Sequence, residues 1–276
     1  MIDNTWPNGW GKKTSIMGIL NITPDSFSDG GDFFNIENAL LQTQKLVQSG
    51  ADILDIGAQS TRPGADIIGE KEEIKRLLPA LIEIRKNFPN LIISIDTFNA
   101  EVAYKALKNG ANWINDVTGG KNDKSILDVV AEFDCPYVIT HSKGNSKTMN
   151  KLSVYNNLME EIINSLIDLS ESAMDKNVRK DKIIWDPGLG FAKNKDHNIY
   201  ILKNLDRLKS FDFPLLIGAS RKRFIGEILN EGNPKNRDIG SLAVSCLCAQ
   251  KNIEIVRVHD VKLNYQLLKV ADNLYR

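Results

Sequence analysis

The sequence predicts an α/β fold in which a single (β/α)8 TIM barrel follows a short N-terminal extension. Short apolar, β-branched runs alternate with longer amphipathic segments along the whole chain. Eight such runs are present, and each ends in polar residues. The length of 276 residues fits one barrel of about 250 residues. An open doubly wound sheet stays the alternative, because strands are easily miscounted in one sequence.

The alternation of apolar runs and amphipathic segments implies parallel strands joined by right-handed crossovers. We expect the strands at residues 16–22, 53–57, 91–97, 113–117, 137–141, 182–187, 214–220 and 253–259. We expect the helices at residues 35–49, 70–87, 100–109, 125–133, 153–176, 198–209, 237–250 and 261–274. No linker or charge block divides the chain. Residues 15–276 are therefore assigned to the barrel, and residues 1–14, with Trp6 and Trp10, to an extension that packs on it.

The charge balance argues against a nucleic-acid or membrane partner. Lys and Arg total 35, and Asp and Glu also total 35, so no net field favours a polyanion. No apolar run approaches the roughly 20 residues that span a bilayer. The first residues contain no apolar signal segment. The three cysteines form no paired framework, which favours the cytoplasm, and Cys246 and Cys248 are interpreted as packing residues rather than metal ligands.

The stretch 16–31, IMGILNITPDSFSDGG, has the character of one wall of an active site. A buried strand ends near Asn21 and opens into a polar, glycine-containing loop. That loop carries Phe27 and Asp29. Each remaining predicted strand likewise ends in polar residues.

Polar residues end all eight predicted strands, where TIM barrels carry their chemistry. In strand order they are Asn21; Asp55; Asp96 and Thr97; Asn115 and Asp116; His141; Asp186; Ser220, Arg221 and Lys222; and Arg257, His259 and Asp260. A barrel interior is normally filled by Val, Ile and Leu. So many polar residues at one rim indicate a binding site.

Each acidic or amide candidate has a structural alternative. Asp96 precedes a predicted helix and is alternatively a helix cap. Asp186 precedes Pro-Gly-Leu-Gly and is alternatively a turn-forming aspartate. Asn115 and Asp116 are adjacent, so only one faces inward, and we choose Asn115. His141 is more often a hydrogen-bonded strand-end histidine than a functional one.

The basic candidates indicate an anion site. Residues 220–222 bring two cations to a strand-to-helix junction, with a solvated basic turn as the alternative. Arg257 and His259 are two apart on a strand and face one side, just before a helix. They suit a phosphate, with an ion pair to Asp260 as the alternative. Cations on one side and carboxylates on the other suit a ligand with an anionic tail and a head rich in N–H donors. An aminopyrimidinone ring bearing a diphosphate has these properties.

Several of these runs together resemble dihydropteroate synthase, a member of the pterin-binding barrels. The resemblance is carried by residues 16–31, 55–64 (DIGAQSTRPG), 94–97 with 115–116, 141–144, 186–191 (DPGLGF), 218–222 and 257–260. It runs in order from about residue 15 to the end of the chain. From the length of 276 residues we expect no fused pyrophosphokinase of the kind that some family members carry.

The resemblance implies a reaction and a cofactor. The enzyme would join 7,8-dihydropterin diphosphate to 4-aminobenzoate, release diphosphate and use Mg²⁺. The implied pterin-binding residues are Asp96, Asn115, Asp186, Lys222 and Arg257; the diphosphate residues are Asn21, Arg257 and His259; and Asn21 also contacts the metal. The implied catalytic set is Asp96, Asp186, Lys222, Arg257 and His259. Two closing loops would wall the aminobenzoate pocket with Phe27, Asp29, Thr61, Arg62 and Pro63. A homodimer through outer helices, with residues 237–250 as a candidate surface, is also implied.

The chain departs from the family pattern near its second loop. Gln59 stands where the family usually has Glu, and Ala58 where it often has Gly. Ser142 and Lys143 replace a common Met-Arg pair. Two rival functions stay open: a methyltetrahydrofolate:corrinoid methyltransferase, which has no diphosphate to hold, and a pterin-binding protein without catalysis.

Overall fold

A computed structural model describes residues 5–22, 32–59, 66 and 68–276 of the chain. The eight strands are β1 (Ser15–Asn21), β2 (Ile53–Gly57), β3 (Ile92–Asp96), β4 (Trp113–Asp116), β5 (Tyr137–Thr140), β6 (Ile183–Asp186), β7 (Leu216–Ile217) and β8 (Ile255–Val258). They pair in parallel in the order β6-β5-β4-β3-β2-β1-β8-β7. A parallel bridge between Trp185 and Leu215 joins the two remaining edges. This closure confirms the predicted barrel over the open doubly wound sheet.

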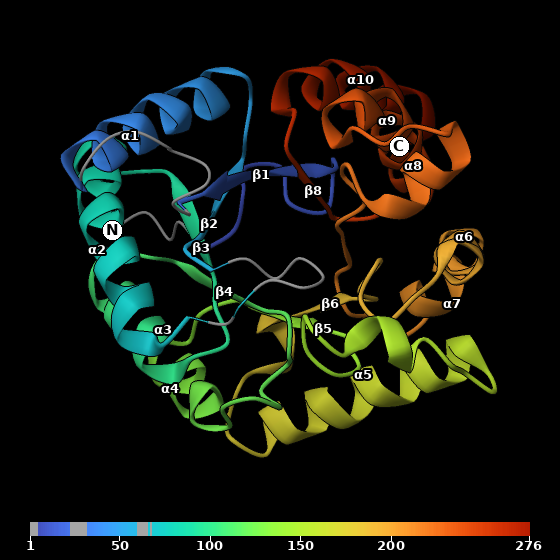
Figure 1. Ribbon diagram of the computed structural model, residues 1–276, viewed down its shortest axis with the longest axis horizontal. Helices are drawn as coiled ribbons and strands as arrows, with labels where there is room; N and C mark the ends of the chain where they lie inside the picture. Colours follow the sequence, from blue (N-terminus) through green and yellow to red (C-terminus); the bar gives the residue numbers. More distant parts are fainter. Residues whose placement is uncertain (1–4, 23–31, 60–65, 67) are drawn as a thin grey trace.

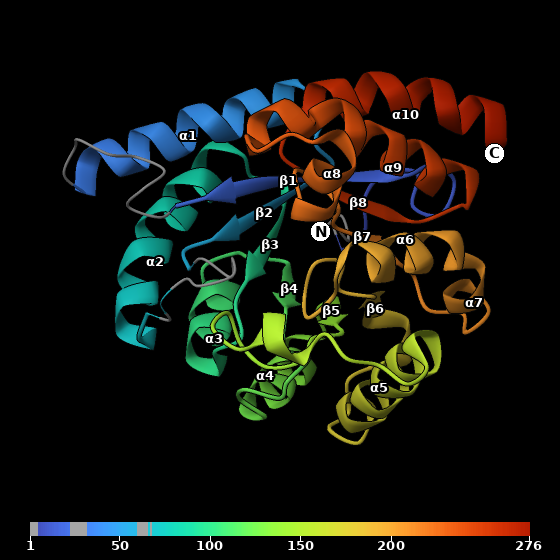
Figure 2. The ribbon, with the colours of Figure 1, turned by 45° about the vertical axis from the view of Figure 1, so that its right-hand side comes forward.

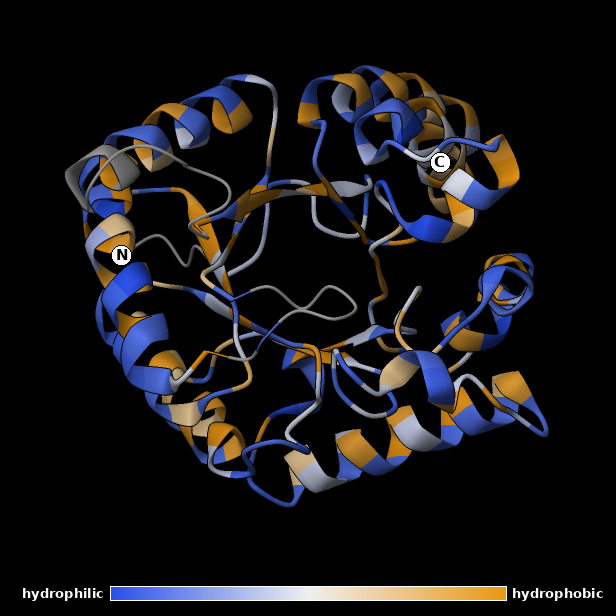
Figure 3. Ribbon diagram, viewed as in Figure 1, coloured by the Kyte–Doolittle hydropathy of each residue, from blue (hydrophilic) through white to orange (hydrophobic). Residues whose placement is uncertain are grey.

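Helices surround the strands in a ring (Figure 1). They are α1 (Asp32–Gln48), α2 (Glu70–Asn87), α3 (Ala100–Lys108), α4 (Ser125–Phe133), α5 (Leu158–Met174), α6 (Lys195–Lys203), α7 (Leu205–Lys209), α8 (Arg223–Leu229), α9 (Asp238–Gln250) and α10 (Val261–Tyr275). Apolar and polar residues alternate along the helices (Figure 3), as expected for helices with one face on a barrel. Figure 2 shows α1 and α10 over β1, and both helices contact that strand. No helix in the described part of the chain has the length and apolarity to cross a bilayer.

The sequence expectation differs from the structure at three helices. The helix expected from residue 153 begins only at Leu158, because Met149–Leu152 forms a 3₁₀ turn and Asn157 caps α5. The helix expected over residues 198–209 is divided into α6 and α7 at Asn204. The short helix α8 has too few residues for a clear periodic pattern and is absent from the sequence prediction.

The amino-terminal end of the barrel is filled with apolar side chains, one from each strand. These are Met17, Ile53, Ile92, Trp113, Val138, Ile184, Leu216 and Ile255. Trp6 and Trp10 pack beneath this layer with their ring centroids 4.5 Å apart, and both meet the Trp113 ring edge-on. Trp113 Nε1 also donates a hydrogen bond to the Thr5 carbonyl oxygen at 2.7 Å. Because this end is packed, we expect a ligand to bind at the opposite, carboxyl-terminal end of the barrel.

Candidate active site

Four neighbouring strands present a row of residues at the carboxyl-terminal end of the barrel. Asn21, Gly57, Asp96 and Asn115 are paired in register from β1 to β4. Residues in register on parallel strands face the same side of the sheet. A Cβ on Gly57 would lie 3.5 Å from Asp96 Cβ and 3.7 Å from Asn21 Oδ1. The glycine therefore leaves the space between the amide and the carboxylate open.

Arg257 joins two carboxylates inside this barrel mouth. Its Nε donates to Asp55 Oδ2 at 2.6 Å, and its Nη2 donates to Asp96 Oδ2 at 2.7 Å. Asp55 Oδ2 also accepts from Asn115 Nδ2 at 3.2 Å. The alternative pairing of Arg257 with Asp260 is wrong, because Asp260 caps α10 by accepting from the Leu263 N–H.

Asp55 has a role that its place on a strand did not reveal. It is completely buried, and it orients both Arg257 and Asn115. The available signal is a single charge inside the run Ile53–Gly57. A charge in a barrel interior is retained only where a partner balances it.

The charges in the mouth influence one another strongly. Burial raises the pKa of Asp96 to about 7, an effect that Arg257 opposes and Asp55 reinforces. Burial acts against the charge of Arg257, but the two carboxylates outweigh it and raise its pKa. Arg257 therefore stays a cation while Asp96 titrates near neutral pH.

Asp186 lies at the end of β6, where the chain turns sharply. Its Oδ1 accepts the Gly188 N–H at 2.7 Å, which is the turn-forming contact expected as the alternative role of this residue. The carboxylate is nevertheless buried within the electrostatic reach of Lys222. Burial raises the pKa of Asp186, and Lys222 is the largest influence in the other direction. Asp186 thus both forms the turn and faces the site.

Lys222 and Arg221 point in different directions although they are adjacent. Lys222 Nζ donates to the Leu189 carbonyl oxygen and lies 4.7 Å from the centre of the Phe191 ring. Burial lowers the pKa of Lys222 to about 8. Arg221 has a positive φ of 58° and forms a two-point ion pair with Asp238, at 2.7 and 2.8 Å. The expectation that both cations face the ligand is therefore wrong for Arg221.

His259 and Asn21 lie at the ends of adjacent strands. The His259 N–H donates to Ser220 Oγ at 3.1 Å, and its Nδ1 lies 3.0 Å from the same oxygen. β1 ends at Asn21 and pairs with β8. Of the expected aminobenzoate residues, Phe27, Asp29, Thr61, Arg62 and Pro63 all lie outside the described residues.

Asp116 and His141 have the structural roles that the sequence favours. Asp116 accepts from Tyr137 Oη and from the backbone of Thr118 and Gly120, each at 2.7 Å. It points away from the mouth, which leaves Asn115 as the inward residue. His141 is buried with its Nδ1 2.8 Å from Lys193 Nζ, and burial lowers its pKa to about 2.

A cavity of about 290 Å³ lies beside the segments that follow β3, β4 and β5. Its lining includes Gln59, Val117, Lys143 and Phe191. Gln59, which departs from the family pattern, accepts the Ile68 N–H through Oε1 at 3.2 Å. Among the described residues, no three His, Cys, Asp or Glu side chains are grouped as a metal site.

Comparisons with known proteins identify the family to which the chain belongs. The model of the pterin-binding enzyme family matches residues 17–259. The chain belongs to the pterin-binding enzyme family. A dihydropteroate synthase from Synechocystis sp. is 46% identical over 97% of this chain and 92% of its own length. The Bacillus subtilis dihydropteroate synthase is 41% identical over 95% of this chain and 88% of its own.

Solved structures of this family show the same fold. A dihydropteroate synthase from Clostridium difficile, solved in the presence of pteroic acid, superposes with a TM-score of 0.91 at 40% identity over all of both chains. One from Xanthomonas albilineans, solved with 4-aminobenzoic acid, gives 0.90 at 36% identity over 96% of this chain and 94% of its own. Within the pterin-binding enzyme family the chain is therefore a transferase of the dihydropteroate synthase type, as the sequence resemblance predicted.

Proposed function

We propose that the protein joins (7,8-dihydropterin-6-yl)methyl diphosphate to the amine of 4-aminobenzoate, giving 7,8-dihydropteroate and diphosphate. The observation that carries the proposal is the cluster of Arg257, Asp55, Asp96 and Asn115 in a barrel mouth that also holds Asp186 and Lys222. Such a site offers acceptors for ring N–H groups and cations for an anionic tail. Neither a corrinoid methyltransferase nor a simple pterin carrier needs the cations, because neither has a diphosphate to bind.

The pterin ring is held by the acidic side of the site. A buried carboxylate accepts two neighbouring N–H groups as it accepts a guanidinium, and Asp186 has this role for the ring N–H and amino groups. Asp96 and Asn115 bind the remaining polar edge, and Lys222 donates to the ring carbonyl oxygen. The low pKa of Lys222, caused by burial, reflects a desolvated donor that gains by meeting a ligand oxygen.

The diphosphate is held by Arg257, His259 and Asn21 at the ends of β8 and β1. The N-terminus of α10 follows directly after His259 and Asp260, and helix N-termini favour anions. Magnesium binds through few protein oxygens and several phosphate oxygens and waters, so the single carboxamide of Asn21 fits a metal that arrives with the substrate. The ion would neutralise charge that develops on the leaving diphosphate.

The reaction is a substitution at the methylene carbon of the pterin. The C–O bond breaks first, and its electron pair leaves with the diphosphate, whose charge meets Arg257 and His259. The carbon becomes cation-like, conjugated with the ring and stabilised by the carboxylates of Asp96 and Asp186. The arylamine nitrogen then forms the C–N bond and loses a proton. The two loops that carry Phe27, Asp29, Thr61, Arg62 and Pro63 bind the aminobenzoate and exclude water that would trap the cation.

The working unit is proposed to be a cytoplasmic homodimer of one barrel domain, residues 15–276, with residues 1–14 as its extension. Support for the dimer comes from apolar side chains exposed on α8 and α9. Ile239 is 79% exposed, Ile228 52% and Leu229 47%. An apolar surface of this kind suits a two-fold interface between copies. Sedimentation of the purified protein tests it: a monomer at micromolar concentration would contradict the dimer.

The assay of the proposed reaction follows two products together. Purified protein is supplied with the pterin diphosphate, 4-aminobenzoate and Mg²⁺, and diphosphate and dihydropteroate are measured. Equal amounts of both, absent when either substrate or the metal is omitted, are expected. No dihydropteroate from folded protein would overturn the proposal.

A further inference from the structure

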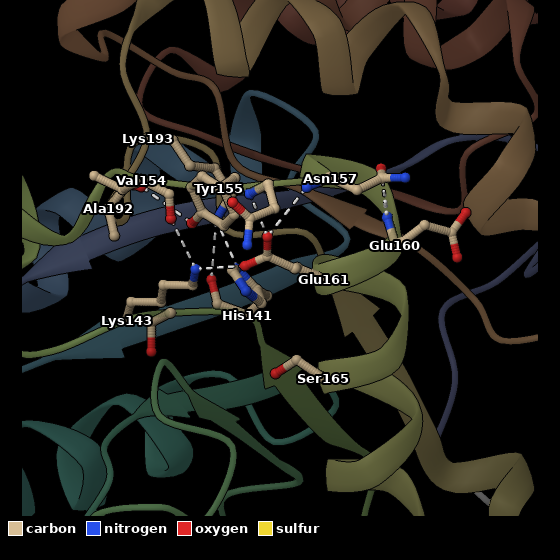
Figure 4. A network of polar contacts seen from close by, with 12 residues as sticks. His141, Lys143, Val154, Tyr155, Asn157, Glu160, Glu161, Ser165, Ala192 and Lys193 are labelled. Atoms are coloured by element: carbon tan, nitrogen blue, oxygen red, sulfur yellow. Dashed lines mark hydrogen bonds and ion pairs between the residues drawn. The ribbon is translucent and has the colours of Figure 1, made fainter.

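Lys193 is a buried lysine whose three contacts all lie within the protein. It is 5% exposed. Its Nζ lies 2.8 Å from His141 Nδ1, 3.0 Å from the Phe191 carbonyl oxygen and 3.3 Å from the His141 carbonyl oxygen. Figure 4 shows the Lys193 and His141 side chains converging at the end of β5. Three acceptors match the three N–H groups of an ammonium.

These contacts fasten the segment that follows Asp186 to the strand beside it. Gly188 has a φ of 68°, and a Cβ there would lie 2.0 Å from the His141 carbonyl oxygen. The segment therefore crosses directly over the end of β5. Further along, the Tyr155 hydroxyl donates to the Ala192 carbonyl oxygen at 3.1 Å (Figure 4). Lys193 joins the last part of the same segment to His141.

The fastened segment carries groups of the proposed pterin site. Phe191 presents its ring to Lys222 Nζ, and the Leu189 carbonyl oxygen accepts from that nitrogen. Asp186 is the residue from which the segment departs. A shift at Phe191 or Leu189 therefore moves Lys222 relative to Asp186.

We infer that Lys193 is a positioning residue for pterin binding. Through its bonds to His141 and Phe191 it keeps Asp186, Phe191 and Lys222 in their positions relative to one another. The inference rests on the proposed function, because it concerns the same site. Lys193 itself is assigned no contact with substrate. It acts through the segment 186–191.

The charges around Lys193 support an electrostatic part of the same role. Burial lowers its pKa; Asp186 opposes that effect, whereas Lys222, Lys143 and Lys121 reinforce it. Lys193 in turn is among the groups that lower the pKa of Asp186, together with Lys222, the Gly188 N–H and Arg257. Removing the ammonium would therefore make the Asp186 carboxyl easier to protonate.

Lys193→Met removes the donors and the charge but keeps most of the volume. We expect the dissociation constant of the pterin diphosphate, titrated alone, to rise by roughly tenfold or more, as lost charged hydrogen bonds predict. The Michaelis constant for the arylamine substrate is expected to change by less than about twofold. Pterin affinity is expected to fall at low pH as Asp186 takes up a proton, and in the variant this fall is expected to begin at a higher pH than in the wild type.

Lys182→Met is the matched control. Lys182 is also buried and lies immediately before β6, at the end of the strand away from Asp186, near Asp134 and Trp6. We expect it to alter thermal stability but neither pterin affinity nor the pH profile. A general effect of losing a buried lysine would appear in both variants, and that outcome would overturn the inference.

His141 supplies a second, independent test. His141→Asn keeps an acceptor close to the position of Nδ1 and is expected to bind pterin as the wild type does. His141→Leu removes the acceptor and is expected to weaken binding as Lys193→Met does. This pair stays decisive if the lysine variant does not fold.

The outcomes separate the two proposals. Wild-type protein that neither binds the pterin diphosphate nor turns it over would overturn the proposed function. Wild-type protein that binds it, while Lys193→Met and His141→Leu bind within twofold of the same affinity, would overturn only the positioning role.

Discussion

Arg257 Nη2 lies 2.7 Å from Asp96 Oδ2, although 161 residues separate the two in sequence. The contact spans from β8 to β3 across the mouth of the barrel. Arg257 also neutralises Asp55, so a single cation balances two buried carboxylates. The stability and the ligand chemistry of the mouth therefore depend on the same side chain.

Arg257→Met is expected to destabilise the fold and abolish turnover. Breaking a buried ion pair on one side leaves uncompensated charge and costs about 3–5 kcal/mol. The loss of free energy of unfolding is expected to be larger at pH 8 than at pH 6. Asp96 takes up a proton as the pH falls below about 7, and the neutral carboxyl no longer needs a cation beside it. Denaturant unfolding at both pH values measures the difference. Arg207→Met, which removes an exposed pair with Glu160, serves as the control and is expected to cost less than about 1 kcal/mol.

Asp96→Asn is expected to change how stability depends on pH. Burial raises the folded-state pKa of Asp96 to about 7 from an ordinary value of 3.8. Between these values the folded state holds the proton more tightly than the unfolded state. This contribution to the free energy of unfolding is complete below pH 3.8 and is lost as the pH rises to about 7.

The asparagine variant lacks this titration. Its stability relative to the wild type should therefore improve from pH 4 to pH 7, by at most about 1.4 kcal/mol per pH unit. Parallel stability curves for the two proteins would show that Asp96 does not titrate in this range.

Gly188→Ala is expected to disrupt both folding and pterin binding. The left-handed φ of 68° and the approach of 2.0 Å to the His141 carbonyl oxygen leave no room for a Cβ. We expect a loss of several kcal/mol, on the order of 3 or more. Thermal unfolding and pterin titration measure the two effects. Gly232→Ala, where a Cβ meets nothing within 4 Å, should behave as the wild type does.

Trp10→Ala is expected to lower stability without altering chemistry. The half-buried Trp10 ring stacks on Trp6 and meets Trp113 edge-on at the closed end of the barrel, opposite the mouth. Its removal should cost about 2 kcal/mol, less than for a fully buried tryptophan. The denaturant midpoint should fall, while kcat and KM measured well below the melting temperature stay unchanged. An equal loss of activity and stability would contradict the separation of the two ends.

The strands and the inward choice of Asn115 could be predicted because periodicity and strand geometry decide them locally. The positions of Asp96, Asp186 and Arg257 at strand ends likewise suffice to predict that they share one rim. The partner of Arg257 could not be predicted, because Asp260 is near in sequence whereas Asp55 is 202 residues away. Nor does the sequence reveal that Arg221 turns toward Asp238, since a positive φ at a non-glycine residue leaves no sequence signal.

The differences between the predicted and observed helices also arise from contacts that the sequence pattern does not show. The division at Asn204 and the late start of α5 depend on capping and 3₁₀ turns that interrupt an otherwise continuous apolar pattern. Lys193 is equally hard to find from the sequence, because a lysine after a glycine-rich turn is usually exposed. Only its three internal acceptors distinguish it.

The most direct test of the proposed function is the dihydropteroate yield of Asp186→Ala and Lys222→Ala beside the wild type, with a melting curve for each. Both residues are assigned to the pterin ring. We predict that each variant stays folded and loses at least about 100-fold in kcat/KM for the pterin diphosphate, since each removes a desolvated charged contact. Wild-type turnover in either variant would contradict the assignment of this barrel mouth to the pterin.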